Sequence, residues 1–127
     1  MKGIIRTGCV KLIGSNSSLK AILDYLCRML LQPKIFDPSK VIAAQSTRNG
    51  GVSPAPFLSL NLGLSVNDDE QNVWKNRALF FGKLGIDIND VSRCYQVHGA
   101  EVLTVTKPVT NDKYDAQITN IPGVFLA

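Results

Sequence analysis

The chain has 127 residues, of which 45% are hydrophobic and 19% are charged. This composition is ordinary for a globular protein and argues against extensive disorder, and the length allows one domain at most. No apolar run reaches the ~20 residues that a membrane-spanning helix needs, so we expect no membrane association.

The basic excess is confined to the N-terminal segment. Residues 1–40 carry seven basic and two acidic side chains, whereas residues 41–127 carry seven basic and eight acidic ones. A nucleic-acid surface needs a basic stripe with interleaved aromatic residues in the body of the chain. The charge pattern therefore predicts no nucleic-acid partner.

Three cysteines, Cys9, Cys27 and Cys94, form no disulfide framework because their number is odd and no CxxC motif occurs. A reducing compartment is the simpler interpretation. The start of the chain lacks the pattern of a secretory signal, since Arg6 and Lys11 interrupt its apolar residues. Both observations predict a cytoplasmic protein.

Residues 1–34 are predicted to form an N-terminal extension, and residues 35–127 the main domain. Ser17 or Ser18 can cap a largely apolar helix from Leu19 to about Leu31, which Pro33 would stop. Such a helix must bury most of its surface against a partner.

The first part of the main domain has strand and loop signals. Val41–Thr47 is predicted to be a strand, and the glycines of the following Arg48–Gly51 loop are expected to need positive φ. Leu58–Leu64 alternates apolar with small or polar residues, which predicts a half-buried strand.

A helix follows, with Asn67 and Glu70 as its expected capping box and Gly85 at its exit. Asp68 and Asp69 favour the positive end of the helix dipole, so capping explains this acidic group better than catalysis does. The spacing of Trp74, Phe80 and Phe81 predicts that they lie in the core.

The sequence returns to strands after Asp90. The expected strands are Ser92–His98, Ala100–Thr106, Ala116–Thr119 and Val124–Ala127. The order predicts an α+β fold, a mixed β-sheet with packed helices. The chain ends in the apolar run Gly123–Ala127, so we expect the sequence to be truncated.

His98 is the only histidine, and it serves either as a structural residue or as a ligand. In a strand, Cys94 and Gln96 would share its face. A joint metal site with Cys94 is excluded there, because four strand residues span roughly 13 Å.

Three other polar residues are candidates with two interpretations each. Arg48, in the Gly-rich loop, either binds a phosphate or carboxylate or is a solvated loop arginine. Asn61 either orients a ligand or satisfies a neighbouring backbone group. Asp115 either holds a turn or faces the site.

Several motifs, taken in order and at their spacing, go beyond this generic pattern. They are Ser46–Ser53 (STRNGGVS), Ser59–Gly63 (SLNLG), Asn76-Arg77, Gln96–Gly99 (QVHG), Asp115–Thr119 (DAQIT) and Pro122-Gly123. Over residues 35–127 the chain resembles the N-terminal half of the YfiH-like laccase-domain family. Members of that family are described both as polyphenol oxidoreductases and as purine nucleoside phosphorylases.

The resemblance implies roles for particular residues. His98, in the QVHG motif, would be one of three metal ligands and catalytic, and Arg48 would lie near the phosphate or nucleoside. Asn61, a candidate from its place in the predicted strand, is the further predicted substrate-binding residue. The other two ligands, a cysteine and a second histidine, belong to the half of the family pattern that would follow Ala127. The laccase-domain fold would then be present only in part.

The resemblance implies a metal-dependent purine nucleoside phosphorylase acting on purine nucleoside and phosphate, with zinc as the metal and adenosine deamination as a side activity. A copper-dependent polyphenol oxidase is the alternative, although one histidine supports several coppers poorly. A third hypothesis is an inactive fragment or binding remnant. The oligomeric state, the preferred nucleoside and the choice of zinc or copper stay open.

Overall fold

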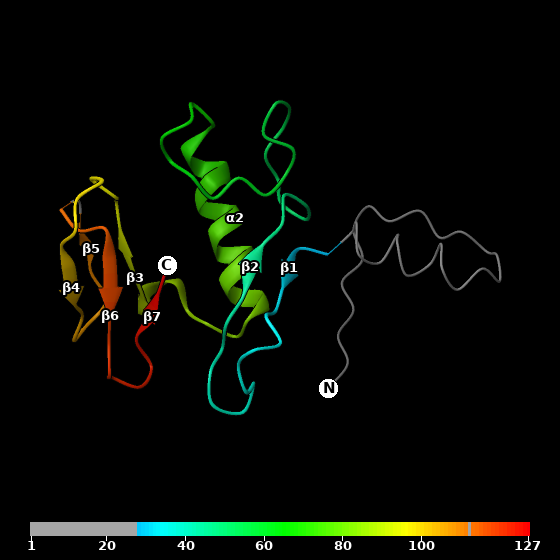
Figure 1. Cartoon of the computed structure of the whole chain (residues 1–127). Helices are drawn as coiled ribbons and strands as arrows, with labels where there is room; N and C mark the ends of the chain where they lie inside the picture. Colours follow the sequence, from blue (N-terminus) through cyan, green and yellow to red (C-terminus); the bar gives the residue numbers. More distant parts are fainter. Residues whose placement is uncertain (1–27, 112) are drawn as a thin grey trace. The chain divides into compact units, whose positions relative to one another are not determined.

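The computed structural model describes residues 28–111 and 113–127, and it divides the chain into two compact units, Met1–Phe80 and Phe81–Ala127 (Figure 1). Residues 1–27, which include most of the predicted apolar helix, lie outside the described residues. The predicted helix is wrong at its C-terminal end, because Leu30–Leu31 form strand β1. The chain is extended there since Thr47 binds the carbonyls of Arg28 and Met29.

Strand β1 pairs antiparallel with β2, Gln45–Ser46, which is shorter than the predicted strand 41–47. The predicted strand Leu58–Leu64 is wrong, because that segment forms no strand. Ser59 and Leu60 instead donate their amides to the carbonyl of Arg48, at 2.7 and 2.8 Å. Loop-to-loop bonds thus take the place of a strand ladder.

The predicted helix is confirmed as α2, Glu70–Lys83. Its N-cap is Asp69, whose carboxylate accepts from the amide of Gln71 at 2.8 Å, so the predicted cap Asn67 is wrong. Asn67 lies two positions too early and has φ +59°. At the other end Gly85 has φ +73°, and Ile86 donates to the carbonyl of Phe81, which confirms the glycine exit.

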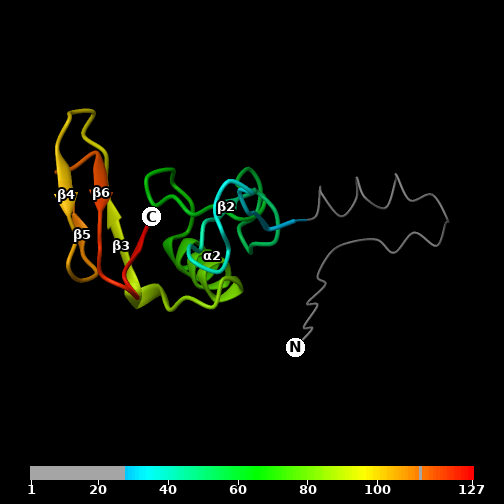
Figure 2. The same cartoon turned by 60° about the horizontal axis from the view of Figure 1, so that its bottom comes forward.

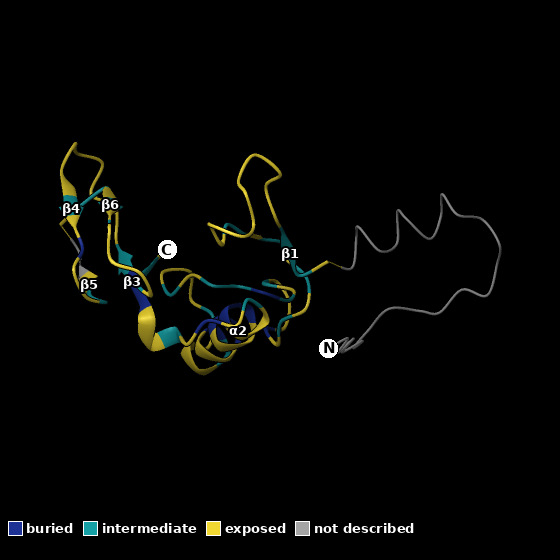
Figure 3. Ribbon diagram, turned by 90° about the horizontal axis from the view of Figure 1, so that it is seen from below, coloured by how far each residue is buried: buried dark blue, intermediate teal, exposed yellow. Residues whose placement is uncertain are grey.

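One face of α2 is buried and the other is exposed, as the dark blue and yellow parts of the helix in Figure 3 show. Val73 and Asn76 are fully buried, and Phe80 and Phe81 are buried as predicted. Trp74 is not a core residue, because 38% of it is exposed. Its ring instead stacks with the Arg77 guanidinium at 5.0 Å and its Nε1 donates to Glu70.

The described residues of the second unit form a short 3-10 helix, Ile88–Asp90 (η1), and five strands. A parallel three-stranded sheet has β3 at its centre, with β5 and β7 on either side. A separate parallel pair joins β4 and β6, which run side by side in Figure 2. The bounds are β3 Val91–Cys94, β4 Val102–Thr104, β5 Thr110–Asn111, β6 Ala116–Ile118 and β7 Phe125–Leu126.

These strands are shorter than the sequence predicts, and β5 was not predicted at all. Most importantly, β3 ends at Cys94, so Gln96 and His98 do not continue its face. The described residues combine one α-helix with antiparallel and parallel strands, which is the α+β class with mixed strand directions. In the same part of the chain, no helix is both long and apolar enough to cross a membrane.

Candidate functional site

Arg48 follows β2 and begins the Gly-rich loop of the first unit. Its Nε donates to the Leu58 carbonyl at 2.9 Å, and the side chain as a whole is exposed. The guanidinium is thereby fixed through Nε on an exposed residue, which is a suitable arrangement for binding an anion. Of the two loop glycines, Gly50 has the expected positive φ, +90°.

Gly51 is needed for a different reason than the expected backbone angle. A Cβ there would overlap the Ser59 carbonyl oxygen and lie 2.5 Å from the Oδ1 of Asn76. The Arg48 loop and the Ser59 segment therefore touch backbone to backbone.

Asn76, on the buried face of α2, joins these two segments. Its Oδ1 accepts from the Val52 amide at 2.7 Å. Its Nδ2 donates to the Ser53 hydroxyl at 2.8 Å, and to the carbonyls of Ser59 and Asn61 at 3.2 and 2.9 Å. One buried amide thus sets the shape of the loop that carries Arg48.

Asn61 lies in this network with its own side chain engaged. Its Nδ2 donates to the Gly63 carbonyl and to Asp68, and its Oδ1 accepts from the Gly63 amide. Asp68 also accepts from the Ser53 hydroxyl at 2.6 Å, and this bond chiefly holds the pKa of Asp68 below its ordinary value. The structure therefore gives Asn61 a local bonding role, and its role toward a substrate stays a prediction.

His98 lies in the turn between β3 and β4, in the second unit. Its φ is +60°, a left-handed conformation that is unusual for a residue other than glycine. The side chain is exposed, and among the described residues no hydrogen bond reaches its ring. The imidazole is therefore open to a ligand.

Asp115, directly before β6, is the residue that holds this turn. Its Oδ1 accepts from the amides of Val97 and His98 at 2.9 and 2.6 Å, and its Oδ2 from the amide of Gly99 at 2.7 Å. Of the two interpretations that the sequence leaves open for Asp115, the structure thus shows the turn-holding one. This capture also explains why the predicted strand Ser92–His98 is wrong beyond Cys94.

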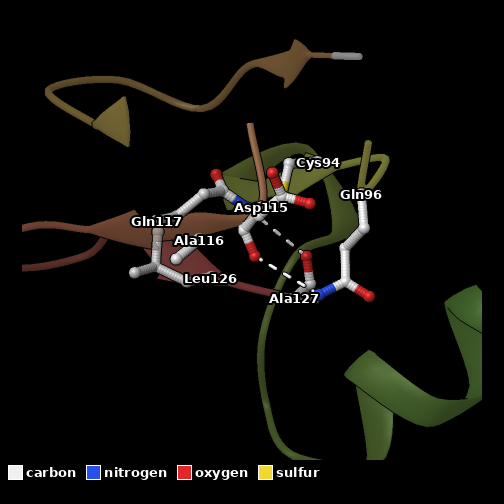
Figure 4. A pocket seen from close by; sticks show the side chains of 7 residues that line it. All are labelled: Cys94, Gln96, Asp115, Ala116, Gln117, Leu126 and Ala127. Atoms are coloured by element: carbon white, nitrogen blue, oxygen red, sulfur yellow. Dashed lines mark hydrogen bonds between the residues drawn. The ribbon is translucent and has the colours of Figure 1, made fainter. Parts of the chain in front are cut away.

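A pocket lies beside this turn, and Figure 4 shows the side chains that line it. Asp115, Cys94 and Gln96 contribute to it, and Gln96 donates to the Asp115 carbonyl at 3.3 Å. Cys94 is a free, half-buried thiol. The remaining lining residues are Ala116, Gln117, Leu126 and Ala127.

A metal site that fits the sequence prediction would need further ligands near His98. Within residues 28–111 and 113–127, no group of three His, Cys, Asp or Glu side chains could hold a metal ion. Catalytic zinc sites take three protein ligands as a rule. The described residues therefore do not make a complete metal site, and the role of His98 as a ligand stays a prediction.

Comparison with known proteins identifies the family. Residues 42–127 match the family model of the multi-copper polyphenol oxidoreductase laccases. The chain belongs to this laccase-domain family. Among its relatives, the purine nucleoside phosphorylase YfiH of Escherichia coli is 38% identical over 99 residues, and YlmD of Geobacillus stearothermophilus, also named purine nucleoside phosphorylase, is 39% identical over 83.

Solved structures of the laccase-domain family share the fold. The YfiH protein of Bacillus licheniformis matches with a TM-score of 0.67 at 32% identity, over 77% of this chain. YlmD of Geobacillus stearothermophilus matches with a TM-score of 0.60 at 34% identity, over 67% of this chain. The chain spans 40% of the length of Escherichia coli YfiH and 30% of that of YlmD, so only part of the laccase domain is present in the chain, as the sequence predicts.

Two residues that organise the site were missed or left undecided by sequence reasoning. In the sequence, Asn76 stands out only as part of a motif, and the pattern leaves the role of Asp115 open. The signal available for Asn76 was a polar residue at i+3 from buried Val73, on the apolar face of a helix. A buried polar side chain at such a position needs bonding partners, which the Gly-rich loop provides.

Proposed function

We propose that the protein is a metal-dependent purine nucleoside phosphorylase. The similarity to YfiH and YlmD, both named purine nucleoside phosphorylases, carries this proposal. In the reaction, a phosphate oxygen bonds to C1′ of the nucleoside while the bond from C1′ to the base nitrogen breaks. The base leaves with a proton, and ribose 1-phosphate is the second product.

The exposed guanidinium of Arg48 supports a role in holding the phosphate. Its Nε is fixed on the Leu58 carbonyl, and the charge sits at the beginning of a loop that Asn76 ties to α2. A guanidinium can form charge-assisted hydrogen bonds to a phosphate. His98 is the proposed catalytic metal ligand of this chain, and a bound metal would activate a water or polarise the substrate.

The test is an assay for phosphorolysis of inosine and adenosine, carried out with the 127-residue chain and with the protein that its natural gene encodes. Purine base and ribose 1-phosphate are measured with zinc or copper added separately. Phosphate-dependent base release by the gene product supports the proposal. Its absence under every metal condition would overturn it.

Variants of Arg48 test the phosphate role. Arg48→Gln should raise the KM for phosphate by roughly tenfold to a hundredfold, because a charge-assisted contact is lost, and leave the KM for the nucleoside unchanged. Arg48→Lys keeps the charge and should lose less. Lys83→Gln, an exposed cation at the end of α2, is the control.

The alternatives make different predictions in the same assays. A copper-dependent phenol oxidase, suggested by the family description, would consume oxygen with a phenolic substrate only when copper is present. If the chain is an inactive fragment, it should show no turnover and retain no stoichiometric zinc after dialysis. The natural gene product should then turn over substrate and retain zinc.

A further inference from the structure

Asp115 is bonded through its backbone as well as through its carboxylate to the loop that contains His98. Its amide donates to the Glu101 carbonyl at 3.1 Å, and its own carbonyl accepts from the Gln96 side chain at 3.3 Å. With the three amides that bind its carboxylate, every polar group of Asp115 contacts the segment from residue 96 to residue 101. That loop is therefore shaped by one residue.

The bonds explain how His98 holds a disfavoured conformation. A left-handed backbone costs a residue with a Cβ roughly 1–2 kcal/mol, and such strain persists only where the surroundings over-determine it. The carboxylate of Asp115 binds the amides on both sides of the strained residue as well as its own. Gly99 allows this approach, since a Cβ there would lie 3.2 Å from Oδ2.

The same arrangement leaves the functional end of His98 untouched. Its amide is bound at 2.6 Å, while no hydrogen bond from the described residues reaches its ring. Since φ sets the direction in which Cβ leaves the backbone, fixing +60° fixes the Cα–Cβ direction from which the imidazole extends. Strain kept by a supporting side chain, with the side chain of the strained residue free, is typical of residues that bind ligands.

We infer that Asp115 is the positioning residue of His98: its carboxylate holds the left-handed turn that presents the imidazole. This inference rests on the proposed function in one respect only, the identity of the ligand that the imidazole binds. The geometry of the turn does not depend on the reaction or on the metal.

The test uses nuclear magnetic resonance of the metal-free chain, in which the single histidine gives one set of ring signals. In Asp115→Asn, an NH2 group replaces one acceptor oxygen and meets the backbone donors. We expect the His98 and Gly99 amides to exchange with solvent at least about tenfold faster, because charge-assisted bonds are lost. The ring signals should move toward their positions in the unfolded chain.

Two internal controls separate this effect from general unfolding. The Arg93 amide, which donates to the Val109 carbonyl in the sheet around β3, should keep its exchange rate. Asp90→Asn, an exposed aspartate of η1, should leave the ring signals unchanged. If Asp115→Asn fails to fold, Gly99→Ala takes its place in the test. The added methyl group would push against Oδ2 of Asp115, while the carboxylate keeps its charge.

A double-mutant cycle gives a readout that a merely supportive role would not move. His98→Gly should shift the unfolding equilibrium toward the folded state about fivefold in the chain with Asp115, because glycine accepts positive φ without strain. With Asp115→Asn the turn relaxes, and the same change should bring no gain. Equal gains in both backgrounds, or ring signals that stay in place in Asp115→Asn, would overturn the inference.

The proposed function can fail separately from this inference. In the natural gene product, Asp115→Asn should lower kcat for phosphorolysis and leave the KM for phosphate unchanged. If the gene product has no phosphorolysis activity, the proposed function is wrong, and the resonance measurements still decide whether Asp115 positions His98.

Discussion

Gly51 and Gly82 show how differently two glycines of one chain depend on their lack of a side chain. At Gly51 the Arg48 loop lies against the Ser59 segment with no room for a Cβ. At Gly82, on the exposed part of α2, a Cβ would meet nothing within 4 Å. The first glycine is a packing requirement, and the second only lowers helix propensity.

Alanine substitutions at these two glycines should therefore change the free energy of unfolding in opposite directions. Gly51→Ala should lower the free energy of unfolding by about 2 kcal/mol or more, because backbone atoms must separate. Gly82→Ala should raise it by roughly 0.5–1 kcal/mol through helix propensity. Urea denaturation followed by circular dichroism measures both. A neutral Gly51→Ala would show that the two segments are not in contact.

Asp68 should contribute to the acid sensitivity of the chain. Its pKa is lowered in the folded state, first by the Ser53 hydroxyl, so its contribution is fully present above its ordinary value near 3.8. That contribution is lost as the pH falls through the lowered pKa. Urea midpoints measured from about pH 6 to pH 2.5 should fall less steeply below pH 4 for Asp68→Asn than for the unchanged chain. Parallel curves would contradict this prediction.

At the scale of elements, the sequence predicts α2 well and the loops poorly. The end and most of the buried face of α2 follow from neighbouring residues, because caps and helical periodicity are local. The predicted cap Asn67 is two residues before the observed cap, Asp69. The predicted strands Leu58–Leu64 and Ser92–His98 have the right alternation. Each segment is instead bonded by a polar side chain distant in the sequence, Asn76 in one case and Asp115 in the other.

The same reason limits what could be predicted of the site. His98 stands out as the only histidine and Arg48 as the arginine of a Gly-rich loop, while their roles are implied by the family resemblance and stay predictions. The left-handed turn at His98 depends on a carboxylate 17 residues later in the chain. No local pattern encodes that distance, so the turn was predicted as a strand.

Asn76 should be among the most sensitive positions of α2. Asn76→Ala would remove the printed partner of the Val52 amide and of the Asn61 carbonyl, while the Ser59 carbonyl would keep its bond from the Ser53 amide. We expect a loss of roughly 2–4 kcal/mol in the free energy of unfolding, because buried polar groups lose their bonds. Asn72→Ala, on the same helix, is the matched control and should change stability by less than about 1 kcal/mol. Equal effects of the two substitutions would remove the special role of Asn76.

At the scale of the whole molecule, the chain carries only part of the length of its relatives and leaves apolar surface uncovered. In the β4–β6 pair, Val102 lies opposite Ala116 and Thr104 opposite Ile118, which places these four side chains on one face. Val102 and Ile118 are 51% and 56% exposed. Parallel strands are usually covered on both faces, so this face is unusual.

The chain alone should therefore bind a hydrophobic dye and associate as its concentration rises. The double variant Val102→Thr, Ile118→Thr keeps β-branched residues and should reduce both effects. Val66→Thr, at an exposed loop valine, is the control. Dye fluorescence and sedimentation velocity measure the two properties. Unchanged association in the double variant would place the contact surface elsewhere.

The hydrogen bonds between Asp115 and the His98 loop also set an order of events during synthesis on the ribosome. His98 leaves the exit tunnel 17 residues before the carboxylate that shapes its turn. At about 5–20 residues per second, the loop stays open for roughly one to three seconds of translation. In a nascent chain from which His98 has emerged but Asp115 has not, the histidine is therefore present without the carboxylate that holds its turn. The left-handed turn at His98 can therefore form only after Asp115 has emerged.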